Sequence, residues 1–426
     1  MDSSWKEKDA AFVWHPYTPI PHHGPKRLIA RAQGAYVYED NGHALFDGTS
    51  SWWCNIHGHC HPRLVAALHR QAQTLDQILF SPHAHPIAIE LAEKLIQKLG
   101  APFSKVFFSD DGSTAVEAAL KMALQYWQLK GEKQRAKFIS LKSAYHGDTL
   151  GAVSVSDTAT FHHFFSKIKA PTFSIAPPFV ENLKTILKAH HQEIAAIIVE
   201  PLLMGAGGML MYSAEELEAL VQAGRNAGVL IIFDEVFTGF GRTGTFFAME
   251  QIPSRPDIVC LSKGLTSGML PLAVTVATND IFSCFVGGDS RTFYHGHTFT
   301  ANALGCAVAL ESLKLFEEEN LIEKNKRFQK LYAQEAERFR KLPRVKAVRT
   351  LGMVWVLELD ADSNRPGWSI ASAVWERGLW IRPLYQLIYL IPPYCSTESD
   401  LQTAFELLYT EIQNSQHFTA SERGSA

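Results

Sequence analysis

Two apolar stretches, VLIIFDE (229–235) and DIVCLSKGL (257–265), decide the fold. The apolar run of the first ends on Asp234, and Lys263 closely follows that of the second. Short, unbroken apolar runs are typical of strands that are buried on both faces of a parallel sheet. We therefore expect the two stretches to form neighbouring buried strands, with Asp234 and Lys263 at their carboxyl ends.

Outside these stretches, strand-like and helix-like segments alternate through the middle of the chain. The expected strands are 105–109, 137–141 and 195–201, and the expected amphipathic helices are 113–127 and 213–228. This alternation predicts an α/β fold with a mostly parallel central sheet that helices cover on both faces.

The two ends of the chain follow a different pattern. One long helix is expected over 303–342, and the stretches WVLELD, LWIRP and LIYLIPP are expected to follow it as strands. The stretch YVYEDNGHALFDG (36–48) predicts a hairpin that turns at Asn41-Gly42. We predict a large domain at 51–310 and a smaller α+β lobe made from 1–50 and 311–426.

The composition is that of a globular protein with a large core, since 46% of the 426 residues are hydrophobic and 19% are charged. The formal net charge of −3 gives no electrostatic reason to expect nucleic acid or an anionic membrane as a partner. No apolar run approaches the roughly 18 residues of a membrane span, and no apolar leader segment begins the chain. Six scattered cysteines without CxxC pairs favour a reducing, cytoplasmic location.

Three chemically apt groups are predicted at the carboxyl ends of strands, where open α/β sheets bind their ligands. These groups are Asp234, Lys263 and the turn 109–112. A lysine that can form a Schiff base and a carboxylate that can hold a pyridine nitrogen protonated are expected for pyridoxal 5′-phosphate (PLP). The alternative for the two residues alone is a solvated lysine and an aspartate that caps a helix.

Two glycine-containing stretches bear on the cofactor. The backbone amides of 112–114 begin a helix, where they can bind a phosphate, and a plain helix cap by Asp111 or Ser113 is the alternative. The stretch GFGRTG (239–244) formally matches a dinucleotide-binding pattern, but no apolar helix follows it. We therefore predict an active-site loop that carries Arg242.

Other residues have two readings each. Tyr145 lies in a glycine-containing loop and is predicted either to stack on a cofactor ring or to cap the core. Arg382 follows a short apolar run and is predicted to bind a substrate carboxylate, with an internal ion pair as the alternative. The pair Trp52-Trp53 is read either as a pocket wall or as core. Three alternating histidines (His57, His59 and His61) lack a nearby carboxylate or CxxC, so we favour a loop and helix start over a metal site.

Taken together and in this order, the segments resemble the fold-type I, class III PLP aminotransferases from about residue 12 to about residue 410. The resemblance is carried by WHPYTP (14–19), SSWWCNIHGHCHP (50–62), ALKMALQYW (119–127), YHGDTLGAVSVSD (145–157), EPLLMGAGGM (200–209), DEVFTGFGRTG (234–244), HGHTF (295–299) and IRPLYQLIYLIPPY (381–394). The tryptophan pair and the last segment are similar to the branch that aminates 8-amino-7-oxononanoate in biotin biosynthesis.

The resemblance implies roles for single residues. Lys263 would be the catalytic lysine that links to the cofactor, and Asp234 would pair with the ring nitrogen. The other residues implied to bind the cofactor are Gly112, Ser113, Tyr145, Val236 and, reaching across a homodimer with shared active sites, Thr298. The residues implied to bind substrate are Tyr17, Trp52, Trp53, Arg242, Gly296, Arg382 and Tyr389, with Arg382 on the carboxylate and Arg242 paired with Asp148.

The resemblance also implies a reaction. An amino group would be transferred to 8-amino-7-oxononanoate in a ping-pong mechanism, with S-adenosylmethionine as the donor. His297 stands where the branch using that donor typically has proline, and the loop after Lys263 is similar to a branch that uses lysine, so lysine stays open as the donor. Another class III ω-aminotransferase activity, with pyruvate or 2-oxoglutarate, also stays open.

Overall fold

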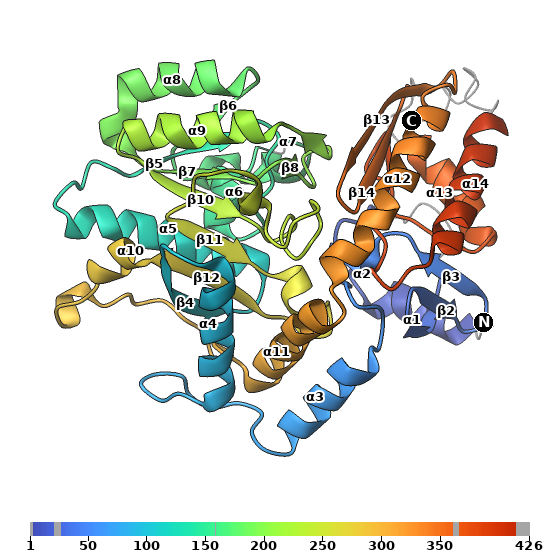
Figure 1. Cartoon of the computed structure of the whole chain (residues 1–426), viewed down its shortest axis with the longest axis horizontal. Helices are drawn as coiled ribbons and strands as arrows, with labels where there is room; N and C mark the ends of the chain where they lie inside the picture. The colour runs from blue at the N-terminus through green and yellow to red at the C-terminus, as the bar shows by residue number, and fades with distance from the viewer. Residues whose placement is uncertain (1–2, 21–26, 158, 361–365, 415–426) are drawn as a thin grey trace.

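The computed structural model describes residues 3–20, 27–157, 159–360 and 366–414. A large part is built around a seven-stranded sheet, and a smaller part beside it contains a four-stranded and a three-stranded sheet (Figure 1). Within the described ranges, no helix combines the length and the apolar character needed to cross a bilayer.

The central sheet has the strand order β4-β12-β11-β10-β7-β5-β6. Its strands are β4 (Phe103–Ser109), β5 (Lys137–Leu141), β6 (Thr172–Ile175), β7 (Ile194–Val199), β10 (Leu230–Asp234), β11 (Ile258–Leu261) and β12 (Ala273–Thr278). β12 pairs antiparallel with both of its neighbours, and the other pairings are parallel. The predicted mostly parallel α/β sheet is therefore confirmed, although β6 and β12 are not among the strands predicted from the sequence.

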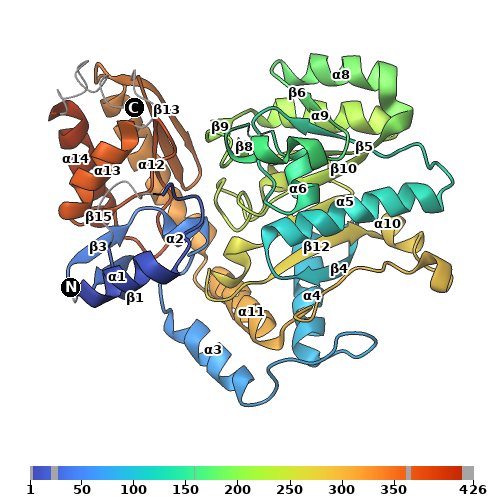
Figure 2. The same cartoon turned by 180° about the vertical axis from the view of Figure 1, so that it is seen from behind.

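Both faces of the sheet are covered, which explains the unbroken apolar runs. On β10, Leu230 and Ile232 pack in one core with α5 (Gly112–Leu129), the helix in front of the sheet in Figure 2. Ile231 and Phe233 pack in the other core, which also contains side chains of α4 (Pro86–Leu99), α8 (Phe179–His190) and α9 (Ala214–Asn226). Because successive strand residues face opposite ways, a strand between two helical layers must be apolar at every position.

The smaller part joins both ends of the chain. The hairpin predicted at Asn41-Gly42 is confirmed, because β2 (Tyr36–Glu39) pairs antiparallel with β3 (Ala44–Asp47). β15 (Leu379–Trp380) then adds to β3 in parallel. The remaining strands are β1 (Ile29–Gln33), β13 (Val345–Leu351), β14 (Val354–Leu359) and β16 (Leu387–Leu390), with β8 (Leu203–Met204) and β9 (Leu210–Met211) in the large part.

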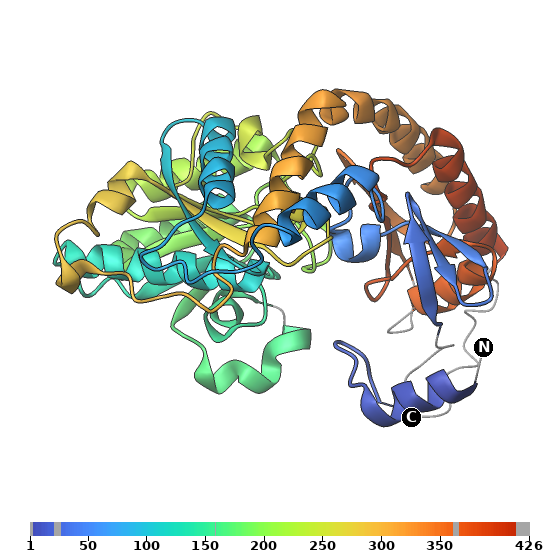
Figure 3. The same ribbon diagram turned by 90° about the horizontal axis from the view of Figure 1, so that it is seen from below.

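The prediction of one long helix over 303–342 is wrong. The chain forms α11 (Ala303–Glu318) and α12 (Leu321–Phe339), which follow each other in the orange arc of Figure 3. Asn320 between them has φ 49°, a left-handed conformation that interrupts an α-helix and that asparagine tolerates better than most residues. The other helices are α1 (Ser3–Phe12), α2 (Ser50–Trp53), α3 (Pro62–Ala72), α6 (Leu150–Val155), α7 (Ala159–His162), α10 (Asn279–Ser283), α13 (Pro366–Glu376) and α14 (Glu398–Asn414).

Candidate active site

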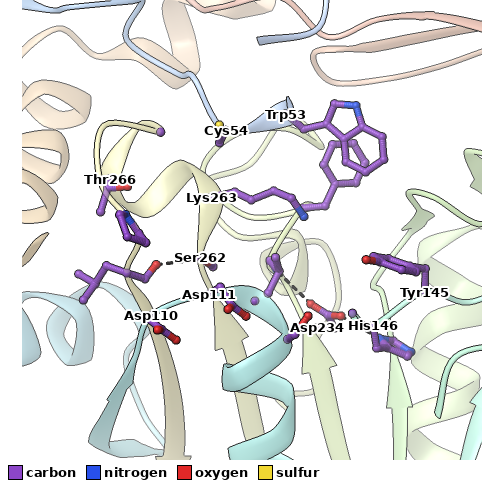
Figure 4. Close-up of a pocket in the computed structure, with 18 of the residues that line it drawn as sticks. Trp53, Cys54, Asp110, Asp111, Tyr145, His146, Asp234, Ser262, Lys263 and Thr266 are labelled. Atoms are coloured by element: carbon purple, nitrogen blue, oxygen red, sulfur yellow. Dashed lines mark hydrogen bonds and ion pairs between the residues drawn. The ribbon is translucent and has the colours of Figure 1, made fainter. Parts of the chain in front are cut away.

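Strand ends converge on one cavity of about 360 Å³. β10 ends on Asp234, Lys263 follows β11, and Gly112 begins the helix that follows β4. All three residues line the cavity, together with Ser113, Tyr145, Val236 and Trp53 from the predicted site. In Figure 4 the Lys263 side chain extends into this space, with Trp53 on one side and Asp234 on the other.

Lys263 is held in an unusual conformation with its amine removed from bulk water. It begins the short 3-10 helix Lys263–Thr266 with φ 45°, in the left-handed region that is costly for a side chain with a Cβ. Burial lowers the pKa of Lys263, against the attraction of Asp234. The amine lies 5.6 Å from the centre of the Trp53 ring. A neutral, nucleophilic amine is therefore accessible at lower pH than for a solvated lysine.

Asp234 is fixed by two donors. Nδ1 of His146 lies 2.7 Å from Oδ2, and the backbone amide of Val236 donates to Oδ1 at 3.1 Å. Since a carboxylate only accepts, the imidazole carries its proton on Nδ1. Both His146 and Asp234 are buried. His146 has no role in the assignment made from sequence, although it stands next to Tyr145 in the quoted loop.

The first two residues of α5, Gly112 and Ser113, line the cavity. Asp111 caps the helix and accepts the amide of Thr114 at 2.9 Å, so the predicted set 112–114 is reduced to Gly112 and Ser113. A Cβ on Gly112 would lie 2.6 Å from Cγ1 of Val236, which excludes any larger residue without movement. The Ser113 hydroxyl accepts the amide of Asp148 at 2.9 Å. The helix start therefore offers amides and a hydroxyl to an anion.

These residues fit PLP by their chemistry. A cavity of suitable size contains a lysine whose pKa is lowered, a carboxylate held by an imidazole, a tyrosine in the wall, and a helix N-terminus for a phosphate.

A second, larger cavity of about 930 Å³ adjoins the first and shares Trp53, Tyr145 and Lys263 with it. Its wall also contains Tyr17, Trp52, Arg382 and Tyr389 from the predicted substrate site. The Arg382 guanidinium lies 4.7 Å from the centre of the Trp52 ring. Among residues whose positions are described, no carboxylate forms an ion pair with Arg382, so its charge is available to a ligand.

Asp148 supplies a negative charge to the larger cavity. It accepts hydrogen bonds from Tyr17, from Tyr145 at 3.0 Å and from His162 at 3.0 Å. The predicted pairing of Asp148 with Arg242 is therefore wrong.

Arg242 binds backbone segments of the protein behind the cavities. Its side chain is buried, and its guanidinium donates to the backbone carbonyls of Pro392, Trp53 and Asn55 at 3.1 to 3.4 Å. The guanidinium also lies 5.0 Å from the centre of the Tyr394 ring. Arg242 therefore connects the Trp53 segment to the chain after β16, and it is not among the residues that line the two cavities.

Gly296 and Thr298 are not among the residues that line the two cavities, although His297 between them lies 3.7 Å from Asp110 in the wall of the smaller one. They belong to the exposed segment that precedes α11, where the Thr298 carbonyl accepts the Gln77 side chain at 2.7 Å. The neighbouring aromatic residues Tyr294 and Phe299 are 82% and 59% exposed.

The alternating histidines point to different partners. Nε2 of His57 lies 3.0 Å from the Ser312 hydroxyl, and Nε2 of His59 lies 2.8 Å from Asp47. In the described parts of the chain, no three His, Cys, Asp or Glu side chains gather as ligands of a metal ion would.

Fold and site together define a PLP-dependent aminotransferase. The chain belongs to the class III aminotransferases, since residues 18–412 match that family. It is 40% identical over 414 residues to the adenosylmethionine-8-amino-7-oxononanoate aminotransferase of Synechococcus elongatus, covering 92% of this chain and 96% of the relative. The crystal structure of the Methanocaldococcus jannaschii protein of the same name superposes with a TM-score of 0.94 at 35% identity, covering 97% and 99% of the two chains. The crystal structure of an ω-transaminase from Pseudomonas jessenii in complex with PMP superposes with a TM-score of 0.91 at 29% identity, covering 97% of this chain and 98% of that one.

Proposed function

We propose that this aminotransferase converts 8-amino-7-oxononanoate to 7,8-diaminononanoate in biotin biosynthesis. The observation that carries the proposal is the pair of charges in the larger cavity, where Arg382 has no carboxylate partner among the described residues and Asp148 is half-exposed. The proposed substrate carries a carboxylate at one end and an amino group beside its keto carbon. Arg382 would bind the carboxylate, and Asp148 would attract the amino group. Relatives such as those from Synechococcus elongatus and Methanocaldococcus jannaschii are named for this substrate.

The residues of the smaller cavity divide the catalytic work. PLP, when bound, supplies an aldehyde that condenses with amines and a ring that accepts electrons from the reacting carbon. Lys263 would remove a proton from the carbon of the donor in the first half-reaction and would deliver a proton to the carbon of the acceptor in the second, because its lowered pKa makes it a competent base. Asp234 would hold the ring nitrogen protonated, and the amides of Gly112 and Ser113 would bind the phosphate.

For the amino donor we propose S-adenosylmethionine. The names of the relatives support it, and the aromatic wall formed by Tyr17, Trp52 and Tyr389 suits a sulfonium cation. Lysine is the second candidate, because His297 stands where the S-adenosylmethionine branch typically has proline.

For the assembly we propose a cytoplasmic homodimer in which Thr298 and Gly296 serve the partner's active site. The exposure of Tyr294 and Phe299 on the same segment supports a covered surface there. For the domains we propose the boundaries 51–310 for the large domain and 1–50 with 311–426 for the small lobe, supported by the pairing of β3 with β15.

An acceptor comparison tests the reaction. The purified protein is loaded with each donor, and amine products are measured by mass spectrometry with 8-amino-7-oxononanoate, pyruvate or 2-oxoglutarate as acceptor. The proposal predicts 7,8-diaminononanoate as the main product, and a Lys263→Ala control gives none. Efficient amination of pyruvate or 2-oxoglutarate, with none of 8-amino-7-oxononanoate, would assign a general ω-aminotransferase activity instead.

A further inference from the structure

An imidazole lies directly behind the acidic group of the larger cavity. His162 ends the short helix α7, and only 3% of its surface is exposed. Its Nε2 lies 3.0 Å from Oδ1 of Asp148. Its ring lies nearly parallel to that of Tyr145, with 5.9 Å between the ring centres and an interplanar angle of 18°. Because the carboxylate only accepts, the proton of the imidazole is on Nε2.

The two oxygens of Asp148 have separate partners. Oδ2 accepts hydrogen bonds from the hydroxyls of Tyr17 and Tyr145, while Oδ1 accepts a hydrogen bond from His162. Burial acts to raise the pKa of Asp148, but the hydrogen bonds from His162 and the two tyrosines outweigh it, and the pKa lies below its usual value. Partners on both oxygens fix the rotation of the carboxylate about its last bond.

We propose that His162 is a positioning residue for substrate recognition, which holds the Asp148 carboxylate in the orientation that receives the amino group of the substrate. The inference rests on the proposed function, because it concerns the amino group of 8-amino-7-oxononanoate. Charge-assisted hydrogen bonds depend on direction, so a carboxylate that turns freely binds an ammonium group less well. His162 does not line the larger cavity, so its effect on the substrate passes through Asp148.

Two substitutions separate the hydrogen bond from the volume of the imidazole. His162→Gln keeps an N–H donor at a similar reach to Nε2, whereas His162→Leu fills similar space without a donor. The kinetic constants of both variants are measured with 8-amino-7-oxononanoate and with 7-oxononanoate, which lacks the amino group. Thermal melting and the visible absorbance of the lysine-bound cofactor show that each variant is folded and loaded.

The expected result is specific to the amino group. His162→Leu raises KM for 8-amino-7-oxononanoate about tenfold or more, since hydrogen bonds to charged groups are among the strong ones, and changes kcat little. The KM for 7-oxononanoate stays as in the wild type, and His162→Gln restores most of the loss. In an Asp148→Asn background, His162→Leu has no further effect.

Two other results overturn the inference alone. If His162→Leu and His162→Gln behave alike, or if KM rises equally for both keto acids, His162 has only a structural role. If the effects of His162→Leu and Asp148→Asn multiply, the imidazole does not act through the carboxylate. Failure of the proposed function is recognised separately, because the wild-type enzyme itself would then not aminate 8-amino-7-oxononanoate.

Discussion

A methyl group added at Gly112 tests how tightly the cofactor end of the site is built. The backbone of Gly112 is not in a left-handed conformation, so alanine meets no conformational penalty there. Its Cβ would lie 2.6 Å from Cγ1 and 3.1 Å from Cγ2 of Val236. Val236 is itself part of the cavity wall, so relief of the contact pushes its methyl groups into the space for the cofactor.

The expected cost follows from overpacking. Extra carbon atoms in a well-packed site cost roughly 1–3 kcal/mol. At about 1.4 kcal/mol for each factor of ten, Gly112→Ala should weaken PLP binding by roughly 5- to 150-fold. The Val236→Ala substitution removes both clashing carbons and leaves only the Val236 Cβ position, at 3.4 Å. The double variant Gly112→Ala/Val236→Ala should therefore bind PLP more tightly than Gly112→Ala alone.

The assay is titration of cofactor-free protein with PLP, followed by the visible absorbance of the lysine-bound form. Val236→Ala alone is the matched control, and chemical denaturation of the cofactor-free proteins shows whether the cost falls on the fold instead. Unchanged affinity in Gly112→Ala would refute the steric reasoning. So would a double variant that binds no better than the single one.

Three further predictions concern the substrate cavity, a loop contact and acid stability. Arg382→Met should lower kcat/KM for the keto acid at least about tenfold, because a hydrogen bond to a charged group contributes roughly 1.5–3 kcal/mol; an unchanged value in steady-state kinetics would contradict this. Gly352→Ala should destabilise the fold by roughly 2–4 kcal/mol in denaturant titrations, since its Cβ would lie 2.4 Å from the Gly244 amide nitrogen. Gly34→Ala, with a similar φ (58° against 55°) and no atom within 4 Å, should cost clearly less; equal losses would refute the contact. Burial, together with the charge of the nearby His61, lowers the pKa of His57 to about 3. On acidification the unfolded chain therefore takes up a proton that the folded protein does not. The free energy of unfolding should fall by about 2 kcal/mol from pH 7.5 to 5. In His57→Gln this part of the pH dependence should vanish. An unaltered dependence of the unfolding free energy on pH would contradict the role of His57.

The central sheet was predictable because most of its strands can be recognised from their own residues. The runs before Asp234 and Lys263 are apolar at every position, as burial on both faces demands. β12 was missed because AVTVAT mixes small apolar residues with two threonines and carries no ionisable group at its end. The break at Asn320 was missed because neither glycine nor proline marks it in EEENLIEK (317–324).

The site was predictable where reactive side chains lie at the ends of strands. It was less predictable where the hydrogen-bond partner of a site residue comes from a distant segment of the chain. Asp234, Lys263 and Gly112 could be placed together because parallel strands end at one edge of a sheet. The partners of Arg242 are backbone carbonyls, which leave no trace in side-chain patterns. His162 lies 14 residues beyond Asp148 and outside the quoted motif, so only the folded chain brings the two together.

The proposed reaction is tested most directly by a single-turnover experiment on the wild-type protein loaded with PLP. S-adenosylmethionine and lysine are added separately, and the visible absorbance of the lysine-bound cofactor is followed. We expect S-adenosylmethionine to bleach the absorbance and 8-amino-7-oxononanoate then to restore it. If lysine bleaches the absorbance and S-adenosylmethionine does not, lysine is the amino donor. Recovery only with pyruvate or 2-oxoglutarate would contradict the proposed reaction.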